Sequence, residues 1–103
     1  MKIYNKLVRD RIPEIIKERG KRYRVHTAGE KEYLHLLRRK IEEEVEEFYE
    51  NPVAEEMGDI LEVVEALMEY HGLDREVVER VKNEKKEKRG GFEKKIILEG
   101  VEE

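Results

Sequence analysis

Two segments of this chain place their apolar side chains at steps of three and four positions, which put one apolar stripe along one side of an α-helix. The first segment begins near Gly29 or Glu30 and runs to about Tyr49, and the second covers about residues 53–71. Asn51-Pro52 separates them, and the residue before a proline disfavours a helical conformation. Two long antiparallel helices joined by a short turn are therefore the predicted centre of the fold. The stripes consist of Leu34, Leu37, Ile41, Val45 and Phe48 in the first segment and Met57, Ile60, Leu61, Val64, Leu67 and Met68 in the second.

Capping and stop signals predict two further helices. Asp10 is expected to cap a short helix that contains "RIPEIIKER", with Pro13 tolerated in its first turn and Gly20 as its stop. Asp74 is expected to cap a third long helix, "REVVERVKNEKKEKR", which Gly90-Gly91 ends.

Two segments are predicted to be extended. Residues 22–28 alternate weakly, and residues 92–100, "FEKKIILEG", have the pattern of a short strand that could pair with them. We therefore expect one all-α domain over residues 1–103, an antiparallel helical bundle with short extended segments near the N- and C-termini.

The composition limits both the core and the chemistry. Of the 103 residues, 47% are charged and 38% are apolar, which predicts a modest core that is completed by oligomerisation. Lys, Glu and Arg are abundant while Cys, Gln and Ser are absent, a usage that resembles thermophilic proteins. With no Cys or Ser and with Thr27 as the only threonine, covalent acyl-type catalysis is nearly excluded. Hydrolysis would have to use water activated by a base or a metal.

Charge and hydropathy also narrow the location and the partners. No apolar run is long enough for a signal peptide or a membrane span, so a cytoplasmic protein is expected. The net charge of −4 argues against a nucleic-acid-binding module, although basic residues gather near both ends of the sequence.

Four carboxylates are spaced so that they would converge between the two long helices. Glu44 and Glu47 are three positions apart, and Glu56 and Asp59 repeat that spacing. Glu44 and Glu56 border the apolar stripes, where a carboxylate loses hydration and is repelled by its neighbours. A hard divalent cation would relieve this, and oxygen-only ligands favour Mg²⁺ or Mn²⁺, which commonly take further ligands from phosphate. The alternative is a solvated acidic surface, because 26 Asp and Glu residues produce such pairs by chance on many faces.

The motifs around these acids resemble a known superfamily. "KIEEEVEEF" followed by "EEMGDILEVVEAL" resembles the EExxE…ExxD signature of the MazG-like all-α nucleoside triphosphate pyrophosphohydrolases, which are related to phosphoribosyl-ATP pyrophosphohydrolase and dimeric dUTPases. "YNKLVRDRIPEII" and "KRGGFEKKIIL" resemble the small single-domain branch described as house-cleaning enzymes for non-standard nucleotides, so the resemblance covers nearly the whole chain. The chain departs from many MazG relatives because only eight residues separate Glu47 from Glu56. This shortens the loop and could alter the pocket for the base.

The resemblance implies a site and a reaction. Its metal ligands fall on Glu44, Glu47, Glu56 and Asp59, while Glu43 matches the first acid of the signature and would orient the site or assist Glu44 in activating water. The implied activity is Mg²⁺-dependent hydrolysis of a nucleoside triphosphate to the monophosphate and pyrophosphate. The alternatives are phosphoribosyl-ATP hydrolysis in histidine synthesis and a helical regulatory or scaffold module without catalysis.

A triphosphate substrate also needs cationic partners. The resemblance implies that Asn83, Lys86 and Arg89 on the third long helix bind the substrate, and Arg9 in "NKLVRDR" is a further candidate. The alternatives are a solvated basic tail for the helix and an ion pair with a helix acid for Arg9. The resemblance further implies a homodimer or homotetramer.

Overall fold

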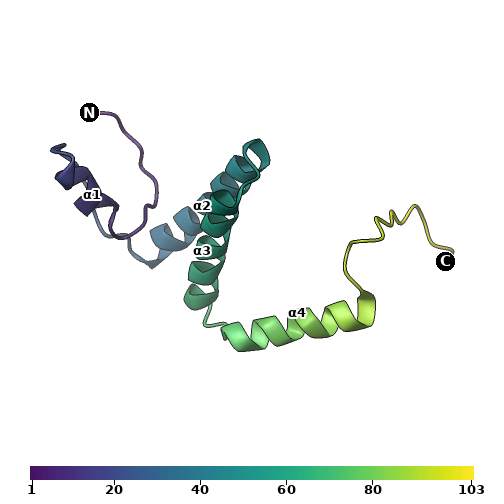
Figure 1. The fold of residues 1–103 in the computed structure, drawn as a ribbon. Coiled ribbons are helices and arrows are strands. Elements are labelled where there is room, and N and C mark those ends of the chain that lie inside the picture. The colour runs from purple at the N-terminus through teal and green to yellow at the C-terminus, as the bar shows by residue number, and fades with distance from the viewer. The chain divides into compact units, whose positions relative to one another are not determined.

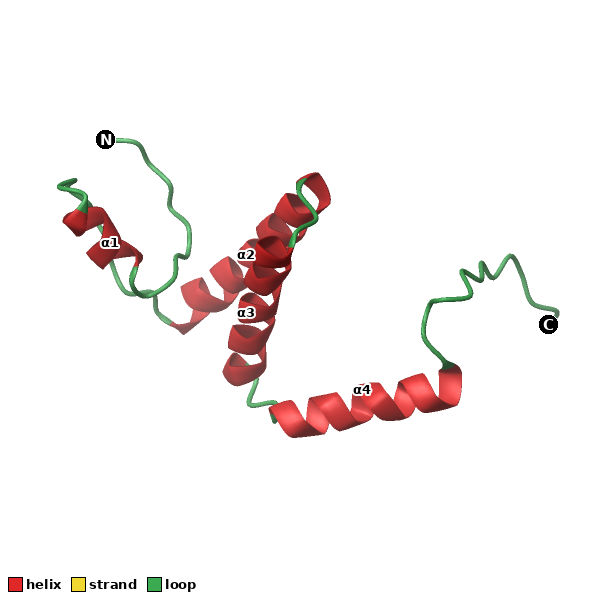
Figure 2. Cartoon of the chain, viewed as in Figure 1, coloured by secondary structure: helices red, strands yellow, loops and turns green.

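The computed structural model describes all 103 residues and contains four helices and no strand (Figures 1 and 2). The helices are α1 (Ile12–Glu18), α2 (Glu30–Glu50), α3 (Ala54–Tyr70) and α4 (Arg75–Arg89). The chain divides into two compact units, Met1–Gly72 and Leu73–Glu103. None of the four helices combines the length and the apolar character that a bilayer crossing requires.

The hairpin of α2 and α3 is the main tertiary contact of the chain. After a turn at residues 51–53, α3 runs back along α2 (Figure 1). The Asn51 N–H still donates to the Glu47 carbonyl oxygen at 2.9 Å, and the Val53 N–H then closes the turn on the Asn51 carbonyl oxygen at 2.8 Å. Asn51-Pro52 therefore breaks the helix as predicted, and both long helices lie within about one residue of their predicted bounds.

The core of the hairpin is small because two helices cannot enclose an interior. Leu37 (1% exposed) and Val63 (8%) are its only buried apolar side chains, and the third buried residue is Glu44. Most other members of the predicted stripes are half-buried, while Leu61 keeps 55% of its surface exposed. The predicted helices are thus confirmed, and their apolar faces are only partly covered within one chain.

The start of α1 corrects one prediction. Asp10 does not cap this helix: the N-cap is Arg11, and no side chain caps it. The reason is a turn closed by the Ile12 N–H on the Arg9 carbonyl oxygen at 3.1 Å, which moves the helix start beyond Asp10. Pro13 lies in the first turn and Gly20 (φ +74°) follows the helix end, as predicted.

The cap of α4 is confirmed. One oxygen of Asp74 accepts hydrogen bonds from the N–H groups of Glu76 (2.8 Å) and Val77 (3.2 Å), which would otherwise lack partners in the first turn. Gly90 ends the helix at φ +83°, a left-handed conformation that favours glycine.

The predicted strand is wrong. Residues 22–28 and 92–100 contain neither helix nor strand, and a turn at residues 92–95 is closed by the Lys95 N–H on the Phe92 carbonyl oxygen at 3.2 Å. Ile96, Ile97 and Leu98 are 77–81% exposed. The local apolar pattern is that of a strand, but a strand also needs a hydrogen-bonding partner and a surface to cover its side chains.

Candidate metal centre

Three of the four predicted ligands meet where α2 and α3 face each other. Glu44 lies two turns before the end of α2, and Glu56 and Asp59 lie in the first turns of α3. One carboxylate oxygen from each of the three lies within 4.8 Å of the others, and we call these residues the acidic cluster. Ligands around Mg²⁺ at ~2.1 Å are about 3 Å apart when adjacent and about 4.2 Å apart when opposite. Small side-chain adjustments would therefore bring the three oxygens to ligand spacing.

Burial leaves two oxygens of the acidic cluster without partners. Glu44 is 6% exposed, and the buried Oε2 atoms of Glu44 and Glu56 have no hydrogen-bond partner. A buried carboxylate oxygen in this state has lost water without a replacement, which is costly and uncommon. Burial is the main cause that raises the pKa of Glu44, and the charge of Glu47 adds to it, while Lys40 acts in the opposite direction.

Glu47, the fourth predicted ligand, lies at the exposed edge of this group. It follows Glu44 by three positions on α2, and its charge is close enough to raise the pKa of the Glu44 carboxyl. The three-carboxylate group does not include it.

Lysine and arginine side chains partly neutralise the acids. Arg9 Nη2 donates to Asp59 Oδ1 at 2.8 Å, and Lys6 Nζ donates to Glu43 Oε1 at 3.2 Å. Lys40 Nζ lies 3.4 Å from Glu44 Oε1 and 3.6 Å from Glu43 Oε1. Five carboxylates and three cations leave a formal charge of −2, which one divalent cation would cancel. The five carboxylates are Glu43, Glu44, Glu47, Glu56 and Asp59, and the three cations are Lys6, Arg9 and Lys40.

A pocket of about 310 Å³ opens beside the acidic cluster. The segment before α1 and the first residue of α1 form one wall, and α2 and α3 supply the other side chains. Arg9 therefore both pairs with a helix acid, which was one of its two predicted roles, and faces a pocket. The lining residues are Lys6, Val8, Arg9, Ile12, Lys40, Glu44 and Asp59.

Lys40 is the member of this site that the motifs did not indicate. It precedes Glu43 by three positions and Glu44 by four, so helical spacing alone places it beside both. Its side chain is only 16% exposed, which is unusual for lysine. The signal was present in the sequence as an i, i+4 pair with the most buried acid.

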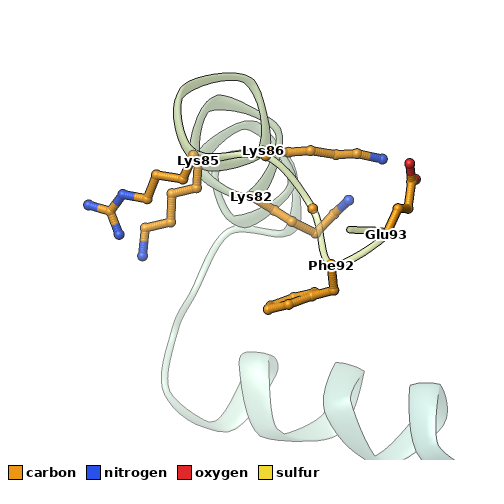
Figure 3. Close-up of a pocket in the computed structure, with 8 residues that line it drawn as sticks. Lys82, Lys85, Lys86, Phe92 and Glu93 are labelled. Atoms are coloured by element: carbon orange, nitrogen blue, oxygen red, sulfur yellow. The ribbon is translucent and has the colours of Figure 1, made fainter. Parts of the chain in front are cut away.

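Only two of the three predicted substrate-binding residues on α4 line the same pocket. A second pocket of about 610 Å³ includes Lys86 and Arg89, but Asn83 does not line it and instead accepts a hydrogen bond from Lys82 Nζ at 3.2 Å. Figure 3 shows Lys85 and Lys86 projecting in different directions from the helix. Basic side chains in the last turn also stabilise the negative end of the helix dipole. The lining residues are Lys82, Lys85, Lys86, Arg89, Gly90, Gly91, Phe92 and Glu93.

Comparison of the chain with known protein families, with curated proteins and with solved structures found no match.

Proposed function

We propose that this chain is a Mg²⁺-dependent nucleoside triphosphate pyrophosphohydrolase that acts on non-standard nucleotides, with Mn²⁺ as an alternative ion. The observation that carries the proposal is the acidic cluster, in which the buried Oε2 atoms of Glu44 and Glu56 have no partner. These groups, together with Asp59, fit a hard divalent cation in charge and in ligand type. The resemblance of "KIEEEVEEF" and "EEMGDILEVVEAL" to the MazG-like signature supports the same assignment.

The acidic residues would have different roles in the reaction. Glu44, Glu56 and Asp59 would hold the cation, with Glu47 at the exposed edge. A bound Mg²⁺ supplies charge for the triphosphate and lowers the pKa of water. Glu43 or Glu44 would accept the proton as a water oxygen attacks the α-phosphorus. The bond from the α-phosphorus to the bridging oxygen then breaks, and pyrophosphate leaves with that oxygen.

Cationic side chains support a polyphosphate substrate. Lys6, Arg9 and Lys40 line the pocket beside the acidic cluster, where they could approach phosphate oxygens. Asn83, Lys86 and Arg89 on α4 are further proposed substrate ligands. Phosphoribosyl-ATP would use the same core chemistry, because it differs from a nucleoside triphosphate only in the nucleoside part. A substrate panel therefore separates hydrolysis of non-standard nucleotides from hydrolysis of phosphoribosyl-ATP.

We further propose that the hairpin is completed as an antiparallel, MazG-like bundle in a homodimer or homotetramer. Only Leu37 and Val63 are buried apolar residues, and the same stripe leaves Met57 and Leu61 38% and 55% exposed. A second hairpin would cover these faces, as the small core of a short chain requires.

Pyrophosphate release tests the proposed activity. A panel of standard and non-standard nucleoside triphosphates and phosphoribosyl-ATP would be assayed with and without Mg²⁺ at elevated temperature. We expect Mg²⁺-dependent release by the wild type and loss of at least about a hundredfold in Glu44→Gln, because a ligand that holds the metal should cost no less than an outer-shell residue. Glu42→Gln, which changes an exposed acid of α2, is the matched control and should retain activity.

Two results would contradict the proposal. One is the absence of pyrophosphate release from every nucleotide in the panel. The other is release that is independent of Mg²⁺ or unaffected by Glu44→Gln.

A further inference from the structure

We propose that Arg9 exchanges partners during binding: it pairs with Asp59 when the cation is absent and binds a phosphate group of the nucleotide once the cation has taken Asp59. This inference rests on the proposed function, because it needs a cation at the acidic cluster. In this order of events the cation binds before the nucleotide, and the segment before α1 supplies a phosphate ligand.

The contacts of Arg9 suit such an exchange. The only protein partner of its guanidinium is Asp59 Oδ1, which Nη2 reaches at 2.8 Å. A guanidinium carries five N–H donors in a planar fork, so the remaining donors are open to a ligand. The side chain is 56% exposed and lines the pocket beside the acidic cluster. Arg9 therefore holds a helix acid with one nitrogen and presents further donors to the space where a substrate would enter.

The backbone allows Arg9 to change partners without a movement of the chain. The Arg9 carbonyl oxygen accepts a hydrogen bond from the Ile12 N–H at 3.1 Å, which fixes the residue at the turn before α1. Val8 and Ile12, on either side of it, also line the pocket. Side-chain rotation alone can therefore carry the guanidinium from Asp59 toward the pocket.

Electrostatics supplies the driving force for the exchange. Asp59 belongs both to the acidic cluster and to the ion pair with Arg9, so a divalent cation and Arg9 compete for its charge. A bound cation weakens the attraction between Asp59 and Arg9 and adds repulsion between like charges. A triphosphate then restores an anionic partner, and arginine can bind phosphate with two parallel hydrogen bonds.

Because Arg9 and the cation compete for Asp59, loss of Arg9 should change the affinity for Mg²⁺ and the affinity for the nucleotide in opposite directions. Arg9→Gln removes a competing positive charge, so the affinity for Mg²⁺ alone should rise about threefold to tenfold at low ionic strength. The same variant removes the phosphate ligand, so the affinity for a nucleotide at saturating Mg²⁺ should fall about tenfold or more. A residue with a purely structural role would weaken both affinities together.

Calorimetric titration of the full chain tests the exchange. Mg²⁺ would be titrated alone, and α,β-methylene-ATP, in which carbon replaces the oxygen of the scissile bridge, would be titrated at saturating Mg²⁺. Arg11→Gln is the matched control, because Arg11 lies outside the pocket and pairs only with Glu14 of α1 (3.1 Å). Arg9→Lys keeps the charge and loses the fork, so Mg²⁺ affinity should stay near the wild-type value while analogue affinity falls. Circular dichroism would verify that each variant retains the helices.

The outcomes separate this inference from the proposed function. Opposite shifts in Arg9→Gln, with no shift in Arg11→Gln, would support the exchange. If the wild type binds Mg²⁺ and the analogue but Arg9→Gln moves both affinities together or moves neither, the exchange is wrong and the proposed function stands. If the wild type does not bind Mg²⁺, both are wrong.

Discussion

The Glu44 side chain is buried, lies near the like charge of Glu47 and has one oxygen without a hydrogen-bond partner. Burial and Glu47 raise its pKa, and Lys40 offsets only part of this effect. Its Oε2 is buried without a hydrogen-bond partner, and the residue as a whole is only 6% exposed. Without a cation the ionised form is thus disfavoured in the folded chain, while a bound cation would favour it. The protonation state of Glu44 should therefore show whether a cation is bound at the acidic cluster.

The pH dependence of stability follows from the direction of this pKa shift. The folded-state pKa of Glu44 lies above its ordinary value of 4.5. The contribution of this carboxyl to the free energy of unfolding is therefore fully present below pH 4.5. That contribution is lost as the pH rises through the folded pKa. In the absence of divalent ions, the free energy of unfolding of wild type relative to Glu44→Gln should therefore fall as the pH rises above 4.5.

Urea denaturation of both proteins between pH 4 and pH 8 in the presence of a chelator measures this difference. Saturating Mg²⁺ should reverse the slope, because the cation binds the deprotonated carboxylate. A difference between the two proteins that is constant with pH would contradict the assignment.

Lys40 is expected to stabilise the cation-free chain and to oppose cation binding. Lys40→Met leaves Glu44 without its ion pair at 3.4 Å, and should lower the free energy of unfolding by about 1–2 kcal/mol in chelator. Mg²⁺ should then bind more tightly, since one competing charge is gone. Urea unfolding and calorimetry measure the two effects, with Arg39→Met, an exposed residue of the same helix, as the control.

A double variant shows whether Glu44 is the cause. In Lys40→Met/Glu44→Gln most of the stability loss should disappear, because no buried charge remains to be paired. If the loss persists in the double variant, Lys40 acts through packing of its aliphatic chain.

At the level of helices and turns, the sequence was most informative where one signal decides one structure. Asp74 is such a signal, since its side chain alone caps α4. Asp74→Ala should reduce the stability of the first turn of α4 by about 1 kcal/mol, whereas Asp74→Asn should keep most of it. Hydrogen exchange of the amides of residues 76–78 measures this. Equal exchange in both variants would contradict a capping role.

The two failures at this scale have different physical causes, a missing distant partner in one case and a competing local turn in the other. Residues 92–100 have a strand-like pattern, but nothing local can supply the hydrogen-bonding partner of a strand. The cap expected at Asp10 fails because the turn from Arg9 to Ile12 shifts the start of α1.

The candidate site shows the same division between local and distant signals. Helical periodicity placed Glu44 and Glu56 at the edge of the hairpin contact, and the structure finds both with buried oxygens. The ion pair of Arg9 with Asp59 spans 50 positions, so periodicity can suggest an acid partner for Arg9 but cannot say which. Lys40 could have been predicted from its spacing to Glu44.

The two long helices raise a question of packing for the molecule as a whole. Their apolar stripes were predicted from spacing, yet within one chain they bury only Leu37, with Val63 beside the second stripe. Each buried apolar side chain contributes about 1.5–3 kcal/mol, so two cannot balance the conformational entropy of the 38 helical residues of the hairpin. The surface still exposed on these helices is then the most direct source of additional stability.

Leu61 is the residue at which this argument can be tested. It belongs to the stripe of α3 but is 55% exposed, so Leu61→Glu should cost an isolated chain little. If a second hairpin covers this face, the variant buries a charge at the interface and should dissociate the homodimer or homotetramer. Sedimentation velocity should then show a smaller species for Leu61→Glu than for wild type. Its melting temperature should fall, and that of the wild type should rise with protein concentration.

Glu62→Gln, which changes an exposed neighbour on α3, provides the control and should leave the assembly intact. If the wild type sediments as a monomer at every concentration, and Leu61→Glu melts at the same temperature, the exposed stripe does not bind a second copy. The hairpin would then have to obtain its stability from the cation at the acidic cluster, and chelation should unfold it. The same two proteins in chelator therefore distinguish assembly from cation binding as the factor that stabilises the fold.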